Sequence, residues 1–225
     1  MKVRNKRGYL QASHANTRCH VRGREGRPVK VANVAVWDDG QQSADRIRGK
    51  DPVRPGDHAG GAASLLQAHP QMQVLGSVET SHPLQQMRAI MPCTAEQTWQ
   101  WDGVNFTVLH PPESGPASPS AQTNAMSCVL HVSNGQRSAL LAGDTETAQE
   151  RVIVDRQQAT PGALQADLLV VGHHGSKTSS SPAFLQAVAP HWGIIQAGYL
   201  NRYGHPAPLI SQRYQDLGIA TRDTA

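Results

Sequence analysis

The stretch Asp167-Leu168-Leu169-Val170-Val171 is an apolar run of strand length that leads directly into Gly172-His173-His174-Gly175-Ser176. A second apolar run, residues 138–142, ends in Gly143-Asp144 in the same way. Such runs are typical of buried strands in open α/β sheets, which carry their chemistry beyond the carboxyl ends of the strands. The two stretches therefore predict a sheet edge with one carboxylate and two imidazoles, a combination that favours a metal-dependent hydrolase.

The rest of the pattern predicts hairpins first, then alternating strands and helices, which is typical of a layered α/β sandwich. Asp102-Gly103 and Asn134-Gly135 are expected to form tight hairpin turns. The predicted helices are 59–69, 82–90, 145–155, 181–188 and 208–217. The predicted strands are 73–78, two within 98–109, 127–132, 138–142, 168–171 and 192–197.

Charge is unevenly distributed along the chain. The first 54 residues hold thirteen Lys and Arg against five Asp and Glu, whereas the remainder holds eight against twelve. Because the basic segment shows no sustained helical or strand period, residues 1–54 are interpreted as an atypical leader, disordered or non-native, in preference to a basic nucleic-acid arm. Residues 55–225 are interpreted as the folded domain.

No run approaches the ~20 apolar residues that a membrane helix needs. The basic start is not followed by the apolar segment of a signal peptide. The chain as written is therefore expected to be soluble.

Asp144 has two interpretations. It could cap a helix over 145–155, or its carboxylate could bridge two metal ions about 3.5–4 Å apart, as in two-metal hydrolases. The pair His173-His174 favours the metal role. Because neighbouring side chains at a strand end point to opposite sides, one imidazole is expected to meet a metal directly and the other to hydrogen-bond or touch substrate.

Three further groups are candidates. Asp57-His58, followed by Ala-Gly-Gly, fits a ligand pair at the mouth of a helix, where glycines let the backbone approach an ion. His205, in the turn that begins at Asn201, either stacks on or protonates a substrate oxygen or is a simple turn histidine. A hydroxyl-rich loop either holds a phosphate or is a solvated turn, and its residues are Ser176, Thr178 and Ser179.

The remaining histidines and the cysteines give weaker signals. Cys19, Cys93 and Cys128 form no CxxC pair, which argues against a zinc knuckle. Cys93 and Cys128 either pair in an oxidising compartment or are two ordinary thiols. No role is assigned to the histidines expected at surface or loop positions, which are His69, His82, His110, His131 and His191.

Taken together and in order, five motifs resemble the C-terminal metallo-β-lactamase-like domain of the ComEC family of DNA internalisation proteins. The resemblance covers about residues 56–225. It implies an α/β fold of the αββα sandwich type, two divalent ions (Mn or Zn), DNA as partner, and an extracytoplasmic position on an inner-membrane protein. The motifs are DHAGG (57–61), WQWDGVNFTVLHP (99–111), LLAGD (140–144), VVGHHGSKTSSS (170–181) and GYLNRYGHP (198–206).

The resemblance also implies roles for individual residues. The intact site would use metal-bound hydroxide to attack phosphorus, with His205 or a metal-bound water protonating the leaving oxygen. Asp57 and Asp144 would be catalytic, and the extracytoplasmic setting favours a Cys93–Cys128 disulfide. The implied metal ligands are Asp57, His58, Asp144, His173 and His174. Motif positions of less defined role, including tentative substrate contacts, are Asn124, Ser127, Ser176, Thr178, Ser179 and Asn201.

The similarity stops within the family's His-x-Asp/His-x-Asp-His signature. Val53 and Pro55 stand where the signature requires ligands four and two residues before Asp57. The sandwich is therefore expected to be incomplete and to hold two ions poorly. The expected function is that of a ComEC-type fragment that would hydrolyse DNA phosphodiesters during natural transformation, with little or no activity here. The alternatives are another metallo-β-lactamase-like hydrolase, acting on esters or lactones, and a non-catalytic DNA-handling module.

Overall fold

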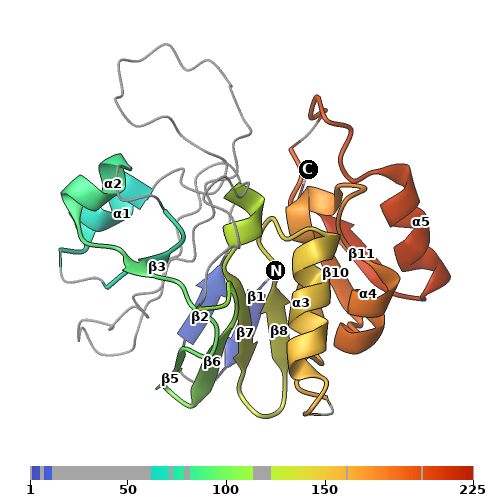
Figure 1. The fold of residues 1–225 in the computed structure, drawn as a ribbon, viewed down its shortest axis with the longest axis horizontal. Coiled ribbons are helices and arrows are strands. Elements are labelled where there is room, and N and C mark those ends of the chain that lie inside the picture. Colours follow the sequence, from blue (N-terminus) through green and yellow to red (C-terminus); the bar gives the residue numbers. More distant parts are fainter. Residues whose placement is uncertain are drawn as a thin grey trace.

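The computed structural model describes residues 2–5, 8–11, 62–70, 73–78, 82–113, 123–160, 162–198 and 200–224. Its centre is a seven-stranded sheet with the order β11-β10-β9-β8-β7-β6-β5 (Figure 1). The strands are β5 (Thr98–Trp101), β6 (Val104–His110), β7 (Val129–Ser133), β8 (Ser138–Leu141), β9 (Leu168–Val170), β10 (Trp192–Ile195) and β11 (Ala220–Asp223).

The sheet has an antiparallel half and a parallel half. Strands β5 to β8 pair antiparallel through two hairpins, whereas β8, β9, β10 and β11 pair parallel. The carboxyl ends of the parallel strands therefore share one edge of the sheet, which is where such sheets place their ligands.

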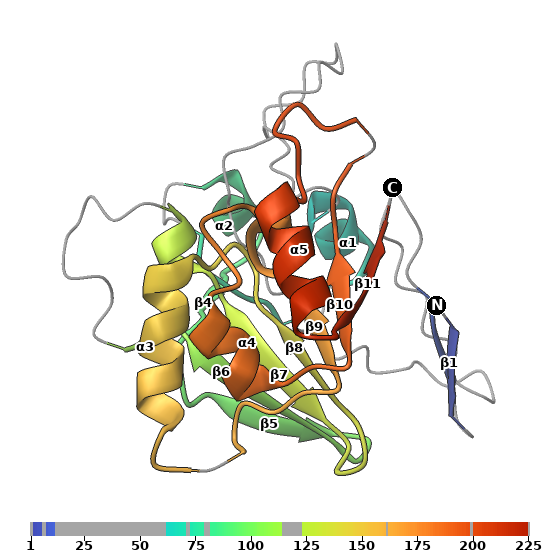
Figure 2. The same cartoon turned by 90° about the vertical axis from the view of Figure 1, so that its right-hand side faces the viewer.

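Three helices cover one face of the sheet (Figure 2). They are α3 (Thr147–Gln157), α4 (Pro182–Val188) and α5 (Pro208–Asp216). Their buried side chains, such as Ile153, Phe184 and Ile210, pack with Leu140 and Leu169 of the strands into the main core. Burying one side chain of this size, compared with leaving it exposed to water, stabilises the folded state by about 1.5–3 kcal/mol.

The opposite face of the sheet has its own apolar cluster. Successive strand residues point to opposite faces, so Leu140 enters the main core while Leu141 packs on the other side. That second cluster includes Leu75, Val108 and Leu130. Beside it lie a two-stranded parallel sheet and two short helices, β3 (Leu75–Gly76), β4 (Met91–Pro92), α1 (Ala62–Ala68) and α2 (Pro83–Met87).

The predicted α/β class is confirmed, with small shifts in element ends. The Asp102-Gly103 turn has the positive φ values of a tight hairpin turn (48° and 78°). The helix expected from residue 145 begins at Thr147. Strands β4 and β11 were not predicted, and both pair with strands distant in sequence, β3 and β10.

In the basic leader the structure describes only β1 (Lys2–Asn5) and β2 (Gly8–Gln11), which pair antiparallel with each other. The remainder of residues 1–54, together with Asp57 and His58, lies outside the described residues, so the domain boundary stays a prediction. Within the described part of the chain, no helix combines the length and apolar character that crossing a membrane requires.

Candidate functional site

Three loops meet beyond the carboxyl ends of β8, β9 and β10, and they carry most of the predicted site residues. The His173 N–H donates to the Gly143 carbonyl at 2.9 Å, joining the loops after β9 and β8. The Ala207 N–H donates to the Gly175 carbonyl at 2.9 Å, joining the loops after β10 and β9. The structure therefore brings Asp144, the two histidines and the His205 turn to one edge.

Asp144 lies at the turn between β8 and α3 and is not the cap of that helix. The N-cap is Glu146, whose N–H donates to Gln149 Oε1 at 3.2 Å, as in a capping box. Asp144 is buried, and its own N–H donates to Ser127 Oγ at 3.1 Å. The capping interpretation of Asp144 is thereby excluded.

Gly143 allows this turn to approach its neighbour closely. It has a φ of +58°, which L residues with a side chain rarely adopt, and a Cβ there would lie 3.3 Å from the Cys128 carbonyl oxygen. The backbone at Gly143 therefore packs closely against Ser127 and Cys128.

His173 and His174 both have left-handed backbone conformations, with φ of 47° and 54°. They lie in a short 3-10 turn, η2 (Gly172–Gly175), and not on the strand end that the sequence suggested. Two successive non-glycine residues in this region cost about 1–3 kcal/mol each, a strain that clusters at functional sites.

The His174 ring is oriented toward Asp144. Its Nδ1 donates to the Gln196 carbonyl at 2.6 Å, and its Nε2 lies 3.5 Å from Asp144 Oδ1. Because Nδ1 is the donor, Nε2 presents either a lone pair or a proton to the carboxylate, and a bound proton or cation would satisfy both groups.

The His173 ring has different partners, as expected for adjacent side chains. Its Nδ1 lies 3.2 Å from Glu146 Oε1 and 3.3 Å from Thr178 Oγ1. Thr178 Oγ1 donates to the same Glu146 oxygen at 3.1 Å. Glu146 was not singled out from the sequence, because its only local signal, a Gln three residues later, is that of a helix cap.

His205 extends the site outward. Its ring centroid lies 6.0 Å from that of His173. Burial lowers the pKa of His205 below its ordinary value, and charge on His173 and His174 lowers it further. The Asn201 side chain fixes this turn, since it accepts from the His205 N–H at 2.9 Å and donates to the His205 carbonyl at 2.7 Å.

In the hydroxyl-rich loop, two of the three candidate side chains are buried and one is exposed. Ser179 is buried, and its hydroxyl donates within the loop to the Gly172 and Ser176 carbonyls. Ser176 is also buried and bonds to Thr178 at 3.1 Å. Thr178 is exposed at the rim, next to exposed Lys177.

Glu150 supports that loop from beneath and was missed by the sequence interpretation. It has no exposed surface, and its carboxylate accepts the N–H groups of Ser180 at 2.5 Å and Ser181 at 2.7 Å. Burial raises its pKa, although these hydrogen bonds oppose the rise. Arg213 donates to the Ser180 carbonyl at 2.6 Å, so the loop is anchored to both α3 and α5.

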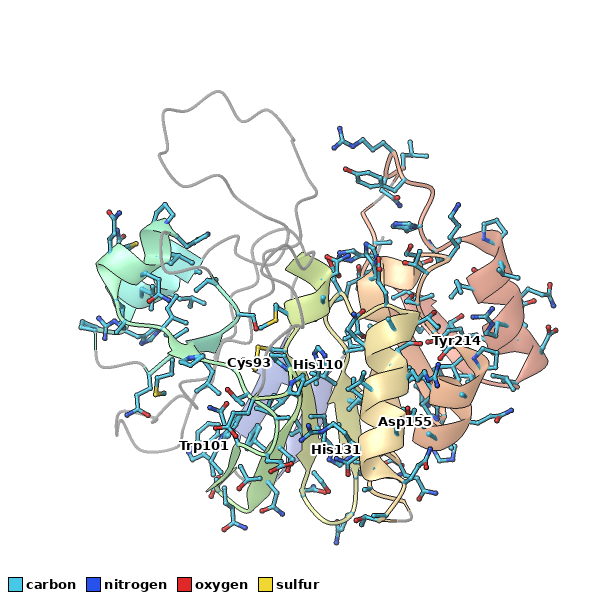
Figure 3. All side chains as sticks on the ribbon, viewed as in Figure 1. Cys93, Trp101, His110, His131, Asp155 and Tyr214 are labelled. Atoms are coloured by element: carbon cyan, nitrogen blue, oxygen red, sulfur yellow. A yellow bond between two sulfur atoms is a disulfide. The ribbon has the colours of Figure 1, made fainter. Side chains whose placement is uncertain are left out.

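A second support lies under Asp144. His110, expected at the surface, is instead buried at the end of β6, and its Nδ1 donates to the Ser127 carbonyl at 2.8 Å. Burial lowers the pKa of His110. Cys93, which lies near His110 in Figure 3, is joined by a disulfide to Cys128 with a Cα–Cα distance of 6.0 Å.

The described residues alone do not fit the expected pair of metal ions. They contain no group of three or more His, Cys, Asp or Glu side chains placed to hold one. Asp144 with His174, and Glu146 with His173, are donor types that zinc and manganese accept, but zinc sites use three or four protein ligands. Asp57 and His58 lie outside the described residues.

Comparison with known proteins gives sequence relatives but no matching family model. Competence protein ComA of Neisseria gonorrhoeae is 42% identical over 125 residues, covering 56% of this chain and 17% of that protein. Recombination protein 2 of Haemophilus influenzae is 34% identical over 169 residues, covering 75% and 20%. ComE operon protein 3 of Bacillus subtilis is 36% identical over 173 residues, covering 72% and 21%. The chain spans about a fifth of the length of these curated relatives.

Solved structures overlap the chain in part. YhfI of Bacillus subtilis, described as a metallo-β-lactamase fold protein, covers 76% of this chain with 71% of its own, at a TM-score of 0.47 and 10% identity. CmlA of Streptomyces venezuelae, described as a diiron β-hydroxylase, covers 71% with 40% of its own, at a TM-score of 0.47 and 12% identity.

Proposed function

We propose that this chain, which is 34–42% identical to competence and recombination proteins over 125 to 173 residues, is a ComEC-like metallo-β-lactamase domain. We propose that it binds single-stranded DNA at the edge formed by the loops after β8, β9 and β10. In this proposal it is the DNA-handling part of a competence protein. Its location would be that of the family, outside the cytoplasm on an inner-membrane protein.

The main support for this proposal is that the loops after β8, β9 and β10 bring acidic and imidazole side chains together at one edge of the sheet. Asp144, His173 and His174 follow two adjacent parallel strands. The two histidines have left-handed backbone conformations, and each of the three residues has a polar partner outside its own turn. Exposed Lys177 at the rim offers a positive charge suited to a phosphate. The neighbouring Thr178 hydroxyl donates to Glu146 in this structure and would have to turn to reach a phosphate.

We propose further that phosphodiester hydrolysis is impaired in this chain. The side chains of Val53 and Pro55 have no atom that can ligate a metal ion. Among the described residues, no three His, Cys, Asp or Glu side chains are placed to hold one together. The site would then bind DNA while holding fewer than two ions. Elemental analysis of the purified chain is expected to find less than one tightly held ion per chain.

Binding and cleavage should be measured on the same protein. Fluorescence anisotropy with labelled single-stranded oligodeoxythymidine is expected to detect binding that Lys177→Ala weakens, with the salt slope reduced by about one. Arg137→Ala is the control, because this basic residue lies at the opposite end of β8. A chain that does not bind DNA, or equal losses in both variants, would contradict the binding proposal.

The cleavage arm uses Mn²⁺ or Zn²⁺ with and without a chelator. No chelator-sensitive cleavage above background is expected. Chelator-sensitive cleavage that Asp144→Asn abolishes would overturn the proposed impairment while leaving the DNA-binding proposal intact.

A further inference from the structure

The turn between β10 and α5 presents aromatic and cationic side chains at the outer margin of the site. The Tyr203 side chain is 39% exposed, and the Arg202 guanidinium lies over its ring, 4.8 Å from the centroid. On the inner side, the Tyr203 and His205 rings are stacked with centroids 5.9 Å apart and an interplanar angle of 22°. His205 in turn faces His173 at 6.0 Å.

The rings of Tyr203, His205 and His173 form a series from solvent to the candidate site. Hydrogen bonds hold the turn that carries Tyr203 and His205. Asn201 bonds to both backbone groups of His205, and the Gly204 N–H donates to the Asn201 carbonyl at 3.1 Å. The Ala207–Gly175 hydrogen bond joins the turn to the loop that carries the histidines. Tyr203 is therefore presented in a defined place and not on a free loop.

An exposed aromatic ring beside an arginine suits a ligand that joins a flat, uncharged ring to a negatively charged group, as a nucleotide does. An exposed aromatic ring stacks on any nucleobase, and an arginine beside it adds cation–π attraction and can contact a phosphate. In a duplex the base faces are already covered by neighbouring base pairs, so an unpaired base is the fitting ligand.

We propose that one unpaired nucleobase of a nucleic-acid strand stacks on the outer face of the Tyr203 ring, in the place that the exposed Arg202 guanidinium takes in this structure. Arg202 would move aside to contact the phosphate, and the backbone of the strand would continue toward His173 and Thr178. This inference rests on the proposed function and adds to it the residue that selects single strands over duplexes. The selection would come from the base and not from the charge of the strand.

The test uses the full chain and three labelled probes of equal length, which are single-stranded oligodeoxythymidine, the same strand with abasic residues, and a duplex. Tyr203→Ala is expected to weaken binding to the base-containing strand about 5- to 150-fold, the range for loss of one stacked base. Tyr203→Phe and Tyr203→Trp should retain binding. Affinity for the abasic strand should not change, an outcome that general damage to the fold would not produce.

Trp192→Ala is the matched control. Trp192 is 43% exposed and has Arg222 over its ring at 5.4 Å, but it lies at the other end of β10. Equal losses for Tyr203→Ala and Trp192→Ala, an unchanged Tyr203→Ala affinity, or an equal loss on the abasic strand would overturn the stacking site. Failure of the wild-type chain to bind any probe would instead overturn the proposed function itself.

Discussion

Glu150 is a buried carboxyl that holds the backbone of another loop through the N–H groups of Ser180 and Ser181. Its folded-state pKa is raised above the ordinary 4.5, chiefly by burial. A group with a raised folded pKa contributes stability that is fully present below its unfolded pKa and is lost as the pH rises through the folded value. Ionisation of Glu150 therefore costs stability at neutral pH.

Replacing Glu150 by Gln should remove this pH dependence. We expect the free energy of unfolding of the wild type to fall, relative to that of Glu150→Gln, as the pH rises above 4.5. Urea denaturation at a series of pH values measures the difference. Asp155→Asn, at an exposed position of the same helix, is the control for the loss of one carboxylate from this helix. Parallel profiles for wild type and Glu150→Gln would show that the buried carboxyl titrates normally.

Side chains that support the site through distant contacts could not be predicted from the sequence. Asp144, His173 and His174 were singled out as candidates because each follows an apolar strand, which is a local signal. Glu150 accepts hydrogen bonds from Ser180 and Ser181, about thirty residues away in the sequence. His110 donates a hydrogen bond to the Ser127 carbonyl, next to the neighbouring strand. No local pattern records such pairings.

At the scale of elements, the two hairpins were predictable because Asp-Gly and Asn-Gly turns determine them locally. Strands β4 and β11 were not, because Met-Pro and Ala-Thr-Arg-Asp are not apolar runs of strand length, and only their pairing with β3 and β10 makes them strands. The loops after β9 and β10 meet in the same non-local way, through Gly175 and Pro206.

Gly175 tests how closely those loops must pack. Its φ is +79°, and a Cβ there would lie 2.8 Å from Pro206 Cβ. Gly175→Ala is expected to displace the His205 turn and to lower the free energy of unfolding by about 1–3 kcal/mol. Gly218→Ala is the matched control, since its φ is +68° with open space around it. Chemical denaturation compares the two, and an equal loss in both variants would mean that only backbone strain matters.

At the scale of the whole molecule, the Cys93–Cys128 disulfide joins the β3–β4 region to the segment under Asp144. The sequence left this pairing open, and only the family resemblance favoured it. Closing a loop with a sequence separation of 35 is worth about 3–4 kcal/mol in the chain-entropy account.

Removing this cross-link should therefore destabilise the chain by about 3–4 kcal/mol. Cys93→Ser under oxidising conditions, or wild type with a reductant, should lower the urea midpoint accordingly. Cys19→Ser, outside the pair, should not change it. If the reductant has no effect on the wild-type midpoint, the two cysteines do not form a stabilising bond in solution.

Photocross-linking would show whether DNA binds at the edge formed by the loops after β8, β9 and β10. A single strand carrying photoreactive thymine analogues would be irradiated with the full chain, and the attached peptides identified by mass spectrometry. We predict attachment within residues 172–181 and 196–207, lost when unlabelled single strand is added in excess. Attachment confined to the basic residues 1–54 would contradict binding at this edge, because DNA would then be held by the leader and not by the site.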